Sequence, residues 1–484
     1  MKIGVIGDGI IGSIVCQYLS KKGYVVDCIS PEISLVSKKF LENMENELIS
    51  LGGNFSPKLE KIELIAYRNK SDKIFKKKCH NFECLELATD MGLAKFWGAN
   101  LAFKGLYKDL KNLNLTKKEW NFIREIIPFL DVQDFYKNNS SNKNSFCLNN
   151  KLEENENIHS STIAVKEDLI NNKKRFIGFD SSKAVFGNFQ ENKYNFTKIN
   201  GKVSKIEIDS ANSAEKLSVL IQGAKGVLKK DYSYIIVSCG AIGSYRLIKN
   251  SFFLNRSKKY FDKILHHPVL NTICFIPDSP YPKNYIGMSN FDLSCKVKNI
   301  KCFVNFIPLK SLIEIKLSIF KRKIKTKFFK RIFEKTFNFI KRVSYIFILP
   351  NILLHRLYIS IIYLPSDFTA SFIGNSSEQL SIKGGLRADF EKTILRNFWP
   401  SLLKKLKRRN IFNLFYRPLI LKTGADFHYS STLSNYTNDD GQLKDIIKSK
   451  KLIIVDSSSS KNLPIPNPTL YFIARAIKLV RNIR

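Results

Sequence analysis

Three glycines close to the first residue have the types and spacing of a phosphate-binding turn. Gly7, Gly9 and Gly12 stand in the segment VIGDGIIGS, residues 5 to 13. In such a turn the first glycine permits the bend, the second lets the backbone approach a pyrophosphate, and the third lets a helix pack closely on a strand. The free N–H groups at the start of that helix attract the phosphate charge. The spacing therefore predicts a dinucleotide site.

The flanking residues predict the strand, turn and helix that this site requires. The apolar run Ile3 to Ile6 precedes the turn, helix-compatible residues 13 to 20 follow it, and a second strand is expected from Tyr24 to Ile29. The acidic residue that should end this strand and bind a ribose hydroxyl is replaced by Ser30, so Glu32 is the better candidate. The turn alone leaves NAD, NADP and FAD undecided.

Length and cysteine usage indicate a large globular protein of the cytoplasm. A chain of 484 residues, 44% of them apolar, can bury a sizeable core and suggests two or more domains. The first strand starts at Lys2, which leaves no room for a signal peptide ahead of it. The nine cysteines include no CxxC pair, and the group Cys79, His80 and Cys84 lacks the second half of a metal site. These features favour a reducing compartment.

The net charge of +37 points to a phosphate-rich partner, either nucleic acid or an anionic membrane. No nucleic-acid motif is found, so no nucleic-acid partner is expected. Residues 316 to 342 hold eleven Lys or Arg, with Phe and Ile at four-residue spacing, and predict a basic amphipathic helix. This helix either lies on an anionic membrane or packs its Phe stripe on the core. A second basic cluster, Lys404 to Arg409 after Trp399, favours the membrane.

The rest of the chain alternates between strand patterns and a few irregular stretches. Residues 138 to 157 are rich in Asn, Ser, Lys and Glu and predict a surface loop. Residues 198 to 208 and 217 to 244 predict short strands that end on the buried strand Tyr234 to Val237. The apolar stretch 345 to 364 is interrupted by charged and polar residues, which favours a helix followed by the strand LYISIIYL over a transmembrane helix.

The last sixty residues carry the most specific pattern. GADFHYSSTLSN and KKLIIVDSSSSKNLPIPNPTLYFIARAIKLV resemble the C-terminal part of the glucose-methanol-choline (GMC) family of FAD-dependent oxidoreductases. In that family a histidine in an HxxGT context precedes a strand that ends in Asp, and Asn-Pro-Thr begins the last helix. The matching residues here are His428, Asp456, Asn467, Pro468 and Thr469.

Three further stretches are similar to the same family. Residues 235 to 251 look like the family's strand and turn SAGAIGSPxLL, with matches that include Gly240. Residues 92 to 101, GLAKFWGANL, are similar to the segment that lies along the flavin, and LHHPV, residues 265 to 269, looks like the His-Pro at the crossing into the substrate domain. Together the matches run from residue 2 to the C-terminal residues, although pattern alone supports the region from 270 to 420.

The resemblance decides the nucleotide in favour of FAD. It implies that the glycine turn holds the FAD pyrophosphate, that the strand around Val203 approaches the adenine, and that Asp456 lies near the ribityl or pyrophosphate region. It also implies that the last helix points its N-terminus at the isoalloxazine ring, where a positive helix end would stabilise the anionic reduced flavin. The expected cofactor-binding residues are Gly7, Gly9, Ile10, Ile11, Gly12, Glu32, Trp97, Gly98, Asn100, Val203, Gly240, Asp456, Pro468 and Thr469.

The resemblance assigns the chemistry to two residues. Alcohol oxidation needs a base for the hydroxyl proton, and the neutral imidazole of His428 suits this task. Asn467 would hold the substrate oxygen by a hydrogen bond. The alternatives are a core histidine and a helix N-cap asparagine. Departures from the family pattern at Met91, Ser431 and Lys461 leave open a degenerate, non-catalytic flavin-binding protein. An NAD(P)-dependent dehydrogenase remains a further alternative.

The expected architecture is α/β, with an FAD-binding Rossmann-like domain of doubly wound, three-layer type and an inserted α+β substrate-binding domain on an antiparallel sheet. The FAD-binding domain is expected over residues 1 to 265, with an excursion at 90 to 165. The substrate-binding domain covers 266 to 423, and 424 to 484 return to the FAD-binding domain. The resemblance favours a sugar hydroxyl as substrate, with an unidentified electron acceptor. The enzyme is expected to be cytoplasmic, with residues 316 to 342 placing it on the inner face of the membrane.

Overall fold

The structure is a computed structural model. It describes residues 1–31, 77–84, 86, 100–127, 130–131, 157–160, 162–170, 173–178, 195–209, 216–224, 226–252, 261–277, 291–309, 356–376, 379–444, 449–465 and 467–483. The predicted loop 138 to 157, apart from its last residue, and the predicted basic helix 316 to 342 lie outside these residues.

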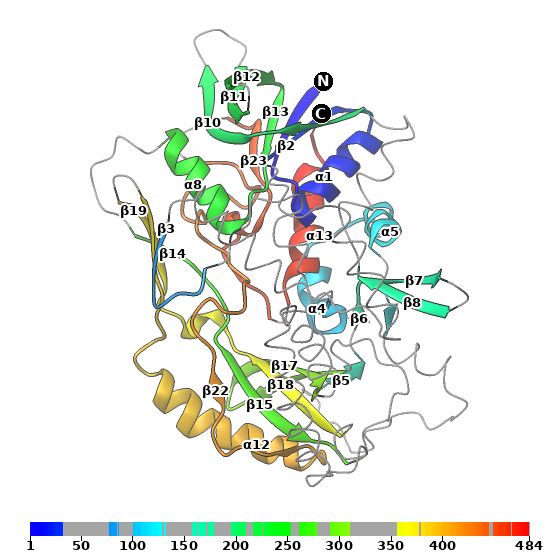
Figure 1. Ribbon diagram of the computed structural model, residues 1–484, viewed down its shortest axis with the longest axis vertical. Coiled ribbons are helices and arrows are strands. Elements are labelled where there is room, and N and C mark those ends of the chain that lie inside the picture. Colours follow the sequence, from blue (N-terminus) through cyan, green and yellow to red (C-terminus); the bar gives the residue numbers. More distant parts are fainter. Residues whose placement is uncertain are drawn as a thin grey trace, which may run out of the picture.

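A five-stranded parallel sheet joins the two ends of the chain (Figure 1). Its strand order is β23-β13-β1-β2-β9, so β1 lies in the centre. The strands are β1 (Lys2–Ile6), β2 (Val25–Ser30), β9 (Phe196–Asn200), β13 (Tyr234–Val237) and β23 (Leu452–Ile454). The strand, turn and helix expected at the N-terminus are confirmed, with α1 at Ile10–Lys21.

The two faces of this sheet are covered differently because side chains alternate along each strand. Ile3 and Val5 pack on the side of α1 and α13 (Thr469–Val480), whereas Ile6 packs on the other side. That other side is covered by an antiparallel sheet and α8 (Gly240–Phe252). Its strands are β10 (Lys202–Asp209), β11 (Lys216–Gly223) and β12 (Gly226–Tyr232). The mixed α/β class is thus confirmed, with a second sheet in one of the outer layers.

A larger antiparallel sheet lies at the opposite end of the molecule (Figure 1). Its order is β21-β15-β18-β17-β16-β5, and β22 also pairs with β15. One face is covered by the π-helical stretch η5 (Glu391–Phe398) and by α12 (Trp399–Lys407). Its strands are β5 (Asn157–Ser160), β15 (Val269–Phe275), β16 (Phe291–Val297), β17 (Ile300–Pro308), β18 (Leu357–Tyr363), β21 (Phe412–Asn413) and β22 (Leu419–Ile420).

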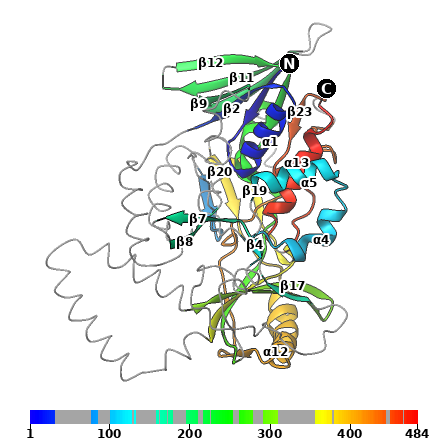
Figure 2. The same ribbon diagram turned by 90° about the vertical axis from the view of Figure 1, so that its right-hand side faces the viewer.

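Smaller elements connect these layers. Helices α4 (Phe103–Lys111) and α5 (Lys117–Ile126) lie beside α1 and α13 (Figure 2) and share an apolar cluster with them. A further sheet has the order β14-β19-β20-β3. Its strands are β14 (Asp262–Lys263), β19 (Phe372–Ser376), β20 (Gln379–Lys383) and β3 (Lys77–His80). Short pairs form between β4 (Leu130–Asp131) and β6 (Thr162–Ile163), and between β7 (Val165–Ile170) and β8 (Lys173–Gly178).

The segment LYISIIYL forms β18, a strand buried in the antiparallel sheet, as the sequence predicts. Among the helices of the described ranges, none combines the length and the apolar character needed to cross a membrane. The division into an FAD-binding and a substrate-binding domain stays a prediction. In the structure β15 to β18 fall between positions 269 and 363, β5 joins their sheet from positions 157 to 160, and β23 returns to the parallel sheet.

Candidate cofactor and active site

The glycine turn has the close packing that its sequence requires. Gly7 has a φ of +100°, and a Cβ there would lie 2.6 Å from the carbonyl oxygen of Ser238. A Cβ on Gly12 would overlap the carbonyl oxygen of Gly7, so only glycine lets α1 start this close to β1. Gly9 precedes α1 without a side-chain cap. The first turn of α1 therefore offers its N–H groups to a ligand.

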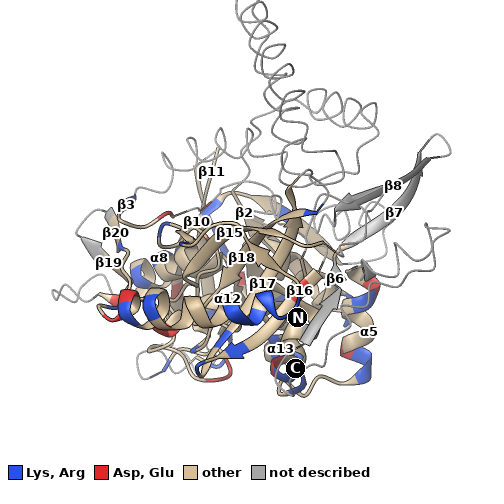
Figure 3. Ribbon diagram, turned by 90° about the horizontal axis from the view of Figure 1, so that it is seen from below, with Lys and Arg blue, Asp and Glu red and all other residues tan. Residues whose placement is uncertain are grey.

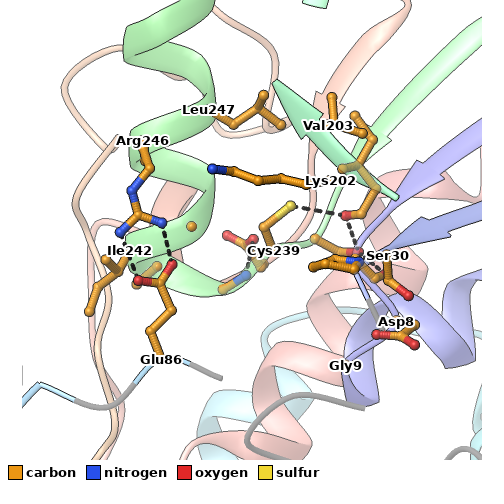
Figure 4. A pocket seen from close by; sticks show the side chains of 18 of the residues that line it. Asp8, Gly9, Ser30, Glu86, Lys202, Val203, Cys239, Ile242, Arg246 and Leu247 are labelled. Carbon is orange, nitrogen blue, oxygen red and sulfur yellow. Dashed lines mark hydrogen bonds and ion pairs between the residues drawn. The ribbon is translucent and has the colours of Figure 1, made fainter. Parts of the chain in front are cut away.

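A cavity of about 410 Å³ lies against this turn (Figure 4). Its size falls in the range of small-molecule and cofactor sites. It is bounded by α1, the end of β2, β10 and the start of α8. The predicted cofactor residues that line it are Gly7, Gly9, Ile10, Ile11, Val203, Gly240 and Asp456. The structure thus gathers positions from both ends and the middle of the chain around one space.

The end of β2 carries a polar atom without a partner. Ser30 lines the cavity together with Pro31. Its Oγ is buried and makes no hydrogen bond. A buried hydroxyl without a partner is costly unless a ligand satisfies it. Ser30 therefore occupies the place where a dinucleotide fold presents a side chain to the ribose, and Glu32 lies outside the described residues.

Asp456 follows β23 and holds the start of α8 beside the cavity. One carboxylate oxygen accepts hydrogen bonds from the N–H of Gly240, at 2.9 Å, and from the hydroxyl of Ser244. The other accepts from the N–H and the hydroxyl of Ser458, at 2.9 and 2.5 Å. Burial raises the pKa of Asp456, and these four donors oppose that shift. The residue lines the cavity, and its hydrogen bonds cap both α8 and the turn that begins at Ser457.

Charged residues that sequence reasoning missed stand on the far wall of the cavity. Arg246 on α8 makes a bidentate ion pair with Glu86, with both N–O distances 2.7 Å. Figure 4 shows this pair and Lys202, which reaches from β10 toward α8. Burial and the nearby Arg246 lower the pKa of Lys202, while Glu86 opposes the shift. Arg246 stands within the matched segment 235 to 251, but a lone Glu86 has no pattern that would reveal it.

His428 lies outside this cavity, in a second cluster of polar side chains. Its Nδ1 has no hydrogen-bond partner and lies 3.8 Å from Oδ2 of Asp426. The rings of His267 and Tyr363 lie 6.3 and 6.2 Å from the His428 ring, measured between centroids. Burial lowers the pKa of His428 to about 4. The imidazole is therefore neutral at physiological pH and able to accept a proton.

Asp426 is the unexpected member of this second cluster. Its side chain is fully buried, Oδ2 accepts the N–H of His267 at 2.8 Å, and Oδ1 has no partner. Burial raises the pKa of Asp426 to about 8. The sequence gives no sign of this residue, because a single Asp two positions before the histidine belongs to no motif. Asp426 and His428 are thus both uncharged at pH 7.

Asn467 lies just before the last helix and keeps a donor available. Its Oδ1 accepts the N–H and the hydroxyl of Thr469, at 3.2 and 2.8 Å, and α13 begins at Thr469 with Pro468 in the N-cap position. Asn467 thus bonds the first residue of the helix from the position before the N-cap. Its Nδ2 makes no hydrogen bond within the described part of the chain. The ring of His267 approaches the carbonyl of Pro464 at 3.2 Å, which links the His428 cluster to the segment before Asn467.

The remaining expected positions fall into three groups. Asn100 is buried and accepts the N–H of Ala102 at the start of α4, away from the cavity lining. Trp97, Gly98 and Met91 lie outside the described residues. Ser431 stands where the family carries glycine, and its φ of +67° is the left-handed conformation that glycine favours. The backbone of the motif is thus kept although the residue type has changed.

Comparison with known proteins gives a match at the level of the fold. No protein-family model matches the chain, and no curated protein sequence matches it. Among solved structures, pyridoxine 4-oxidase from Mesorbium loti matches with a TM-score of 0.56 and 11% identity, over 99% of this chain and 98% of that chain. A flavoprotein/dehydrogenase from Cytophaga hutchinsonii gives a TM-score of 0.32 and 9% identity, over 100% of this chain and 80% of the other. The chain therefore shares the fold of pyridoxine 4-oxidase over nearly its whole length.

Proposed function

We propose that this protein is an FAD-dependent oxidoreductase of GMC type that oxidises an alcohol to a carbonyl compound. The observation that carries the proposal is the cavity of about 410 Å³ against the Gly7 turn, since residues predicted independently from the sequence line it. The shared fold with an enzyme named as an oxidase supports the same class. The order of His428, Asp456 and Asn467 along the chain supports the family.

The residues of the cavity fit the adenosine and pyrophosphate half of FAD. The N–H groups at the start of α1 suit the pyrophosphate, and the lack of side chains at Gly7 and Gly12 lets α1 start close to β1 and Ser238. The unpartnered hydroxyl of Ser30 suits a ribose hydroxyl, and Val203 offers an apolar surface for the adenine. When bound, the flavin would accept a hydride from the substrate carbon at its N5 atom.

The second cluster supplies the proton chemistry. His428 is held neutral by burial, so it can take the proton of a substrate hydroxyl. The carboxyl group of Asp426 lies 3.8 Å from Nδ1, where its oxygen can accept the N–H of the imidazolium that His428 becomes. The free Nδ2 donor of Asn467 can hold the substrate oxygen in the family's manner.

We propose a sugar hydroxyl as the substrate class. The resemblance to the GMC family supports this class, and so does one structural feature. Asn271, Ile361, Asn305 and Asp292 form a row across four strands of the large antiparallel sheet, so their side chains share a face. Tyr363, two residues beyond Ile361 on β18, shares that face and contacts the His428 ring. The Oδ1 atom of Asn271 is buried without a partner. Amide and carboxylate groups in such a row suit a substrate with several hydroxyl groups.

The cellular setting is part of the proposal. A basic helix at 316 to 342 would hold the enzyme on the cytoplasmic face of the membrane, where lipid-linked saccharides are accessible. The electron acceptor that reoxidises the flavin is not assigned. Deletion of residues 316 to 342 should weaken binding to anionic liposomes, and unchanged binding would refute this part of the proposal.

The cofactor is tested by the visible absorption spectrum of the purified protein and by the mass of the compound that acid releases. We expect a yellow protein that releases FAD. A colourless protein that does not take up added FAD would overturn the proposal. Turnover of NADH or NADPH without flavin would indicate the nicotinamide-dependent alternative.

The catalytic residue is tested by the bleaching of flavin absorbance when alcohols and sugars are added. H428A should slow flavin reduction by about 10²- to 10⁴-fold, because a positioned base contributes an effect of that size, and its FAD content should be unchanged. H80A is the matched control, since His80 is exposed on β3. Equal rates in H428A and in the unsubstituted protein would favour the non-catalytic flavin-binding alternative.

A further inference from the structure

Helix α12 presents a basic surface at the outer side of the large antiparallel sheet. Its inner side chains, Trp399, Leu402 and Leu406, are buried against that sheet. Lys404 and Lys407 on the helix, and Arg408 after it, are exposed. Figure 3, viewed from below, shows Lys and Arg positions in blue along the ribbon of α12. Residues 392 to 425 contain nine Lys or Arg and no Asp or Glu, so the whole segment carries one sign of charge.

Apolar side chains project into solvent directly beside this helix. In the segment 412 to 419, Tyr416 is 82% exposed, Leu419 65% and Phe415 53%, and Phe412 and Leu414 are exposed as well. Single exposed apolar residues are ordinary, but a group of them within eight residues marks an interaction site. We call this segment, residues 412 to 419, the apolar strap.

The apolar strap is held in place by the fold. Its ends form β21 and β22, which both pair with β15. The indole N–H of Trp399 donates to the carbonyl of Tyr416 at 2.8 Å and joins the strap to α12. An ordered backbone therefore presents the exposed side chains. Binding does not have to include the entropic cost of ordering this segment.

We propose that α12 and the apolar strap together dock on an anionic phospholipid bilayer. Phe415, Tyr416 and Leu419 would enter the boundary between headgroups and acyl chains, while Lys404, Lys407 and Arg408 face the lipid phosphates. The boundary between headgroups and acyl chains binds protein surfaces on which aromatic and aliphatic side chains lie beside lysines and arginines. The inference is independent of the flavin chemistry, because none of these residues lines the cavity or contacts His428.

Charge and exposed apolar side chains together favour a membrane over a second copy of this chain or a nucleic acid as the occupant of this surface. In a symmetric contact with a second copy of this chain, the same basic residues would face one another and repel. Nucleic acid would satisfy the lysines and arginines, but it would leave Leu414 and Leu419 exposed to water. An anionic bilayer satisfies both kinds of side chain at once.

The test measures sedimentation of the full-length protein with vesicles of phosphatidylcholine, with or without phosphatidylserine. We expect binding only when phosphatidylserine is present, and weaker binding as salt is raised. K404E/K407E/R408E should lower the partition coefficient at least about tenfold, since each basic residue near such a surface contributes a several-fold effect. K111E/K117E/K118E, which makes the same charge change at exposed lysines of α4 and α5, is the control and should stay within about twofold.

The apolar part is tested by F415S/Y416S/L419S and by Y416S alone, with flavin content and thermal unfolding as checks of folding. Both should bind vesicles more weakly, the triple variant more so. Full binding by the charge-reversal variant or by the triple serine variant would overturn the proposal. A change of oligomeric state in the serine variants without vesicles would identify an interface between copies instead. Tighter binding to a DNA duplex than to vesicles, unaffected by the serine changes, would identify a nucleic-acid surface.

Discussion

Burial keeps two side chains of the candidate active site uncharged at pH 7. At pH 7 an exposed aspartate is ionised, but Asp426 keeps its proton because it is enclosed with too few donors. His428 is held neutral for the same physical reason. An ion pair at 3.8 Å, in which Oδ1 of Asp426 and Nδ1 of His428 have no hydrogen-bond partner among the described residues, would not repay its loss of hydration. The resting pair is thus neutral, and a charge appears only when a substrate proton is transferred.

The pH dependence of flavin reduction follows from this arrangement. A base works only when it is unprotonated, and the pKa of His428 is about 4. The rate at low substrate concentration should therefore rise with pH through about 4 and be nearly level from about 5.5 to 7.5. Stopped-flow bleaching across this range measures it. A half-maximal rate near pH 6.5, the value for an exposed imidazole, would contradict the role of burial.

The pH dependence of stability has a sign that can be worked out for Asp426. The pKa of Asp426 is about 8 in the folded protein, whereas an ordinary aspartate has a pKa of 3.8. Between these two pH values the folded state keeps a proton that the unfolded chain releases. The contribution of Asp426 to the free energy of unfolding is fully present below about pH 4. It is lost as the pH rises to 8, by at most about 1.4 kcal/mol per pH unit.

D426N removes this titration and keeps the shape of the side chain. Thermal unfolding should show D426N to be more stable than the unsubstituted protein, with a difference that grows from pH 4 to pH 8. D440N, which makes the same chemical change at an exposed aspartate, should show no such growth. A difference independent of pH would mean that Asp426 is ionised in the folded protein.

At the scale of elements, the sequence was most informative where local rules fix the backbone. The strand, turn and helix around Gly7 and Gly12 were predictable because close packing and a positive φ restrict those positions to glycine. The strand β18 was predictable because polar residues interrupt the apolar stretch around it. The turn at Ser431 was predictable only through the resemblance, since serine itself does not indicate a left-handed conformation.

Contacts between distant elements could not be predicted in the same way. The pair Glu86 and Arg246 joins positions 160 residues apart, and neither residue type reveals a partner. Asp456 was expected beside the cofactor, yet two of its four hydrogen bonds hold the start of α8 and the other two hold Ser458, contacts that no local pattern indicates. The pairing of β5 with β16 in the large sheet likewise depends on tertiary packing rather than on local pattern.

The crossing of α1 over β1 gives a prediction at this scale. G12A places a methyl group against the carbonyl of Gly7 and the hydroxyl of Ser238, so α1 must move away from the sheet. We expect a loss of about 2 kcal/mol or more in unfolding free energy, as for other overpacked sites, together with weaker retention of FAD.

G223A is the matched control for this substitution. A Cβ at Gly223 has its nearest neighbour at 3.6 Å, which is ordinary contact. This variant should keep its FAD and change stability by no more than about 0.5 kcal/mol. If G12A also kept its FAD and its stability, the close crossing of helix and strand would not matter for the site.

At the scale of the whole molecule, the cavity and the His428 cluster lie on different sheets. The parallel sheet and its turn face the cavity, and the large antiparallel sheet carries Tyr363 next to His428. If the cavity holds the adenosine and pyrophosphate part of FAD, as we propose, compounds that carry only this part should also stabilise the protein. Ligands that bind only the folded state raise the temperature of unfolding.

Removal and return of the cofactor tests this division. The cofactor-free protein should unfold several degrees lower than the FAD-bound form, since a ligand at 100 times its Kd contributes about 2.7 kcal/mol. Added FAD should restore the difference and ADP should restore part of it. FMN, which has no adenosine, should have little effect at the same concentration. Stabilisation by FMN equal to that by FAD would mean that the glycine turn is not the main binding region.

The closure of the parallel sheet by the C-terminal residues has a consequence for biosynthesis. The hydroxyl of Tyr24 donates to the carbonyl of Ile483, a contact between residues 459 positions apart. During translation the glycine turn leaves the ribosome first, but β23, Asp456 and α13 emerge last. Until then β13 has an open edge and α1 an uncovered apolar face. The growing chain therefore cannot complete this sheet, or cover this face of α1, until β23 and α13 have been synthesised.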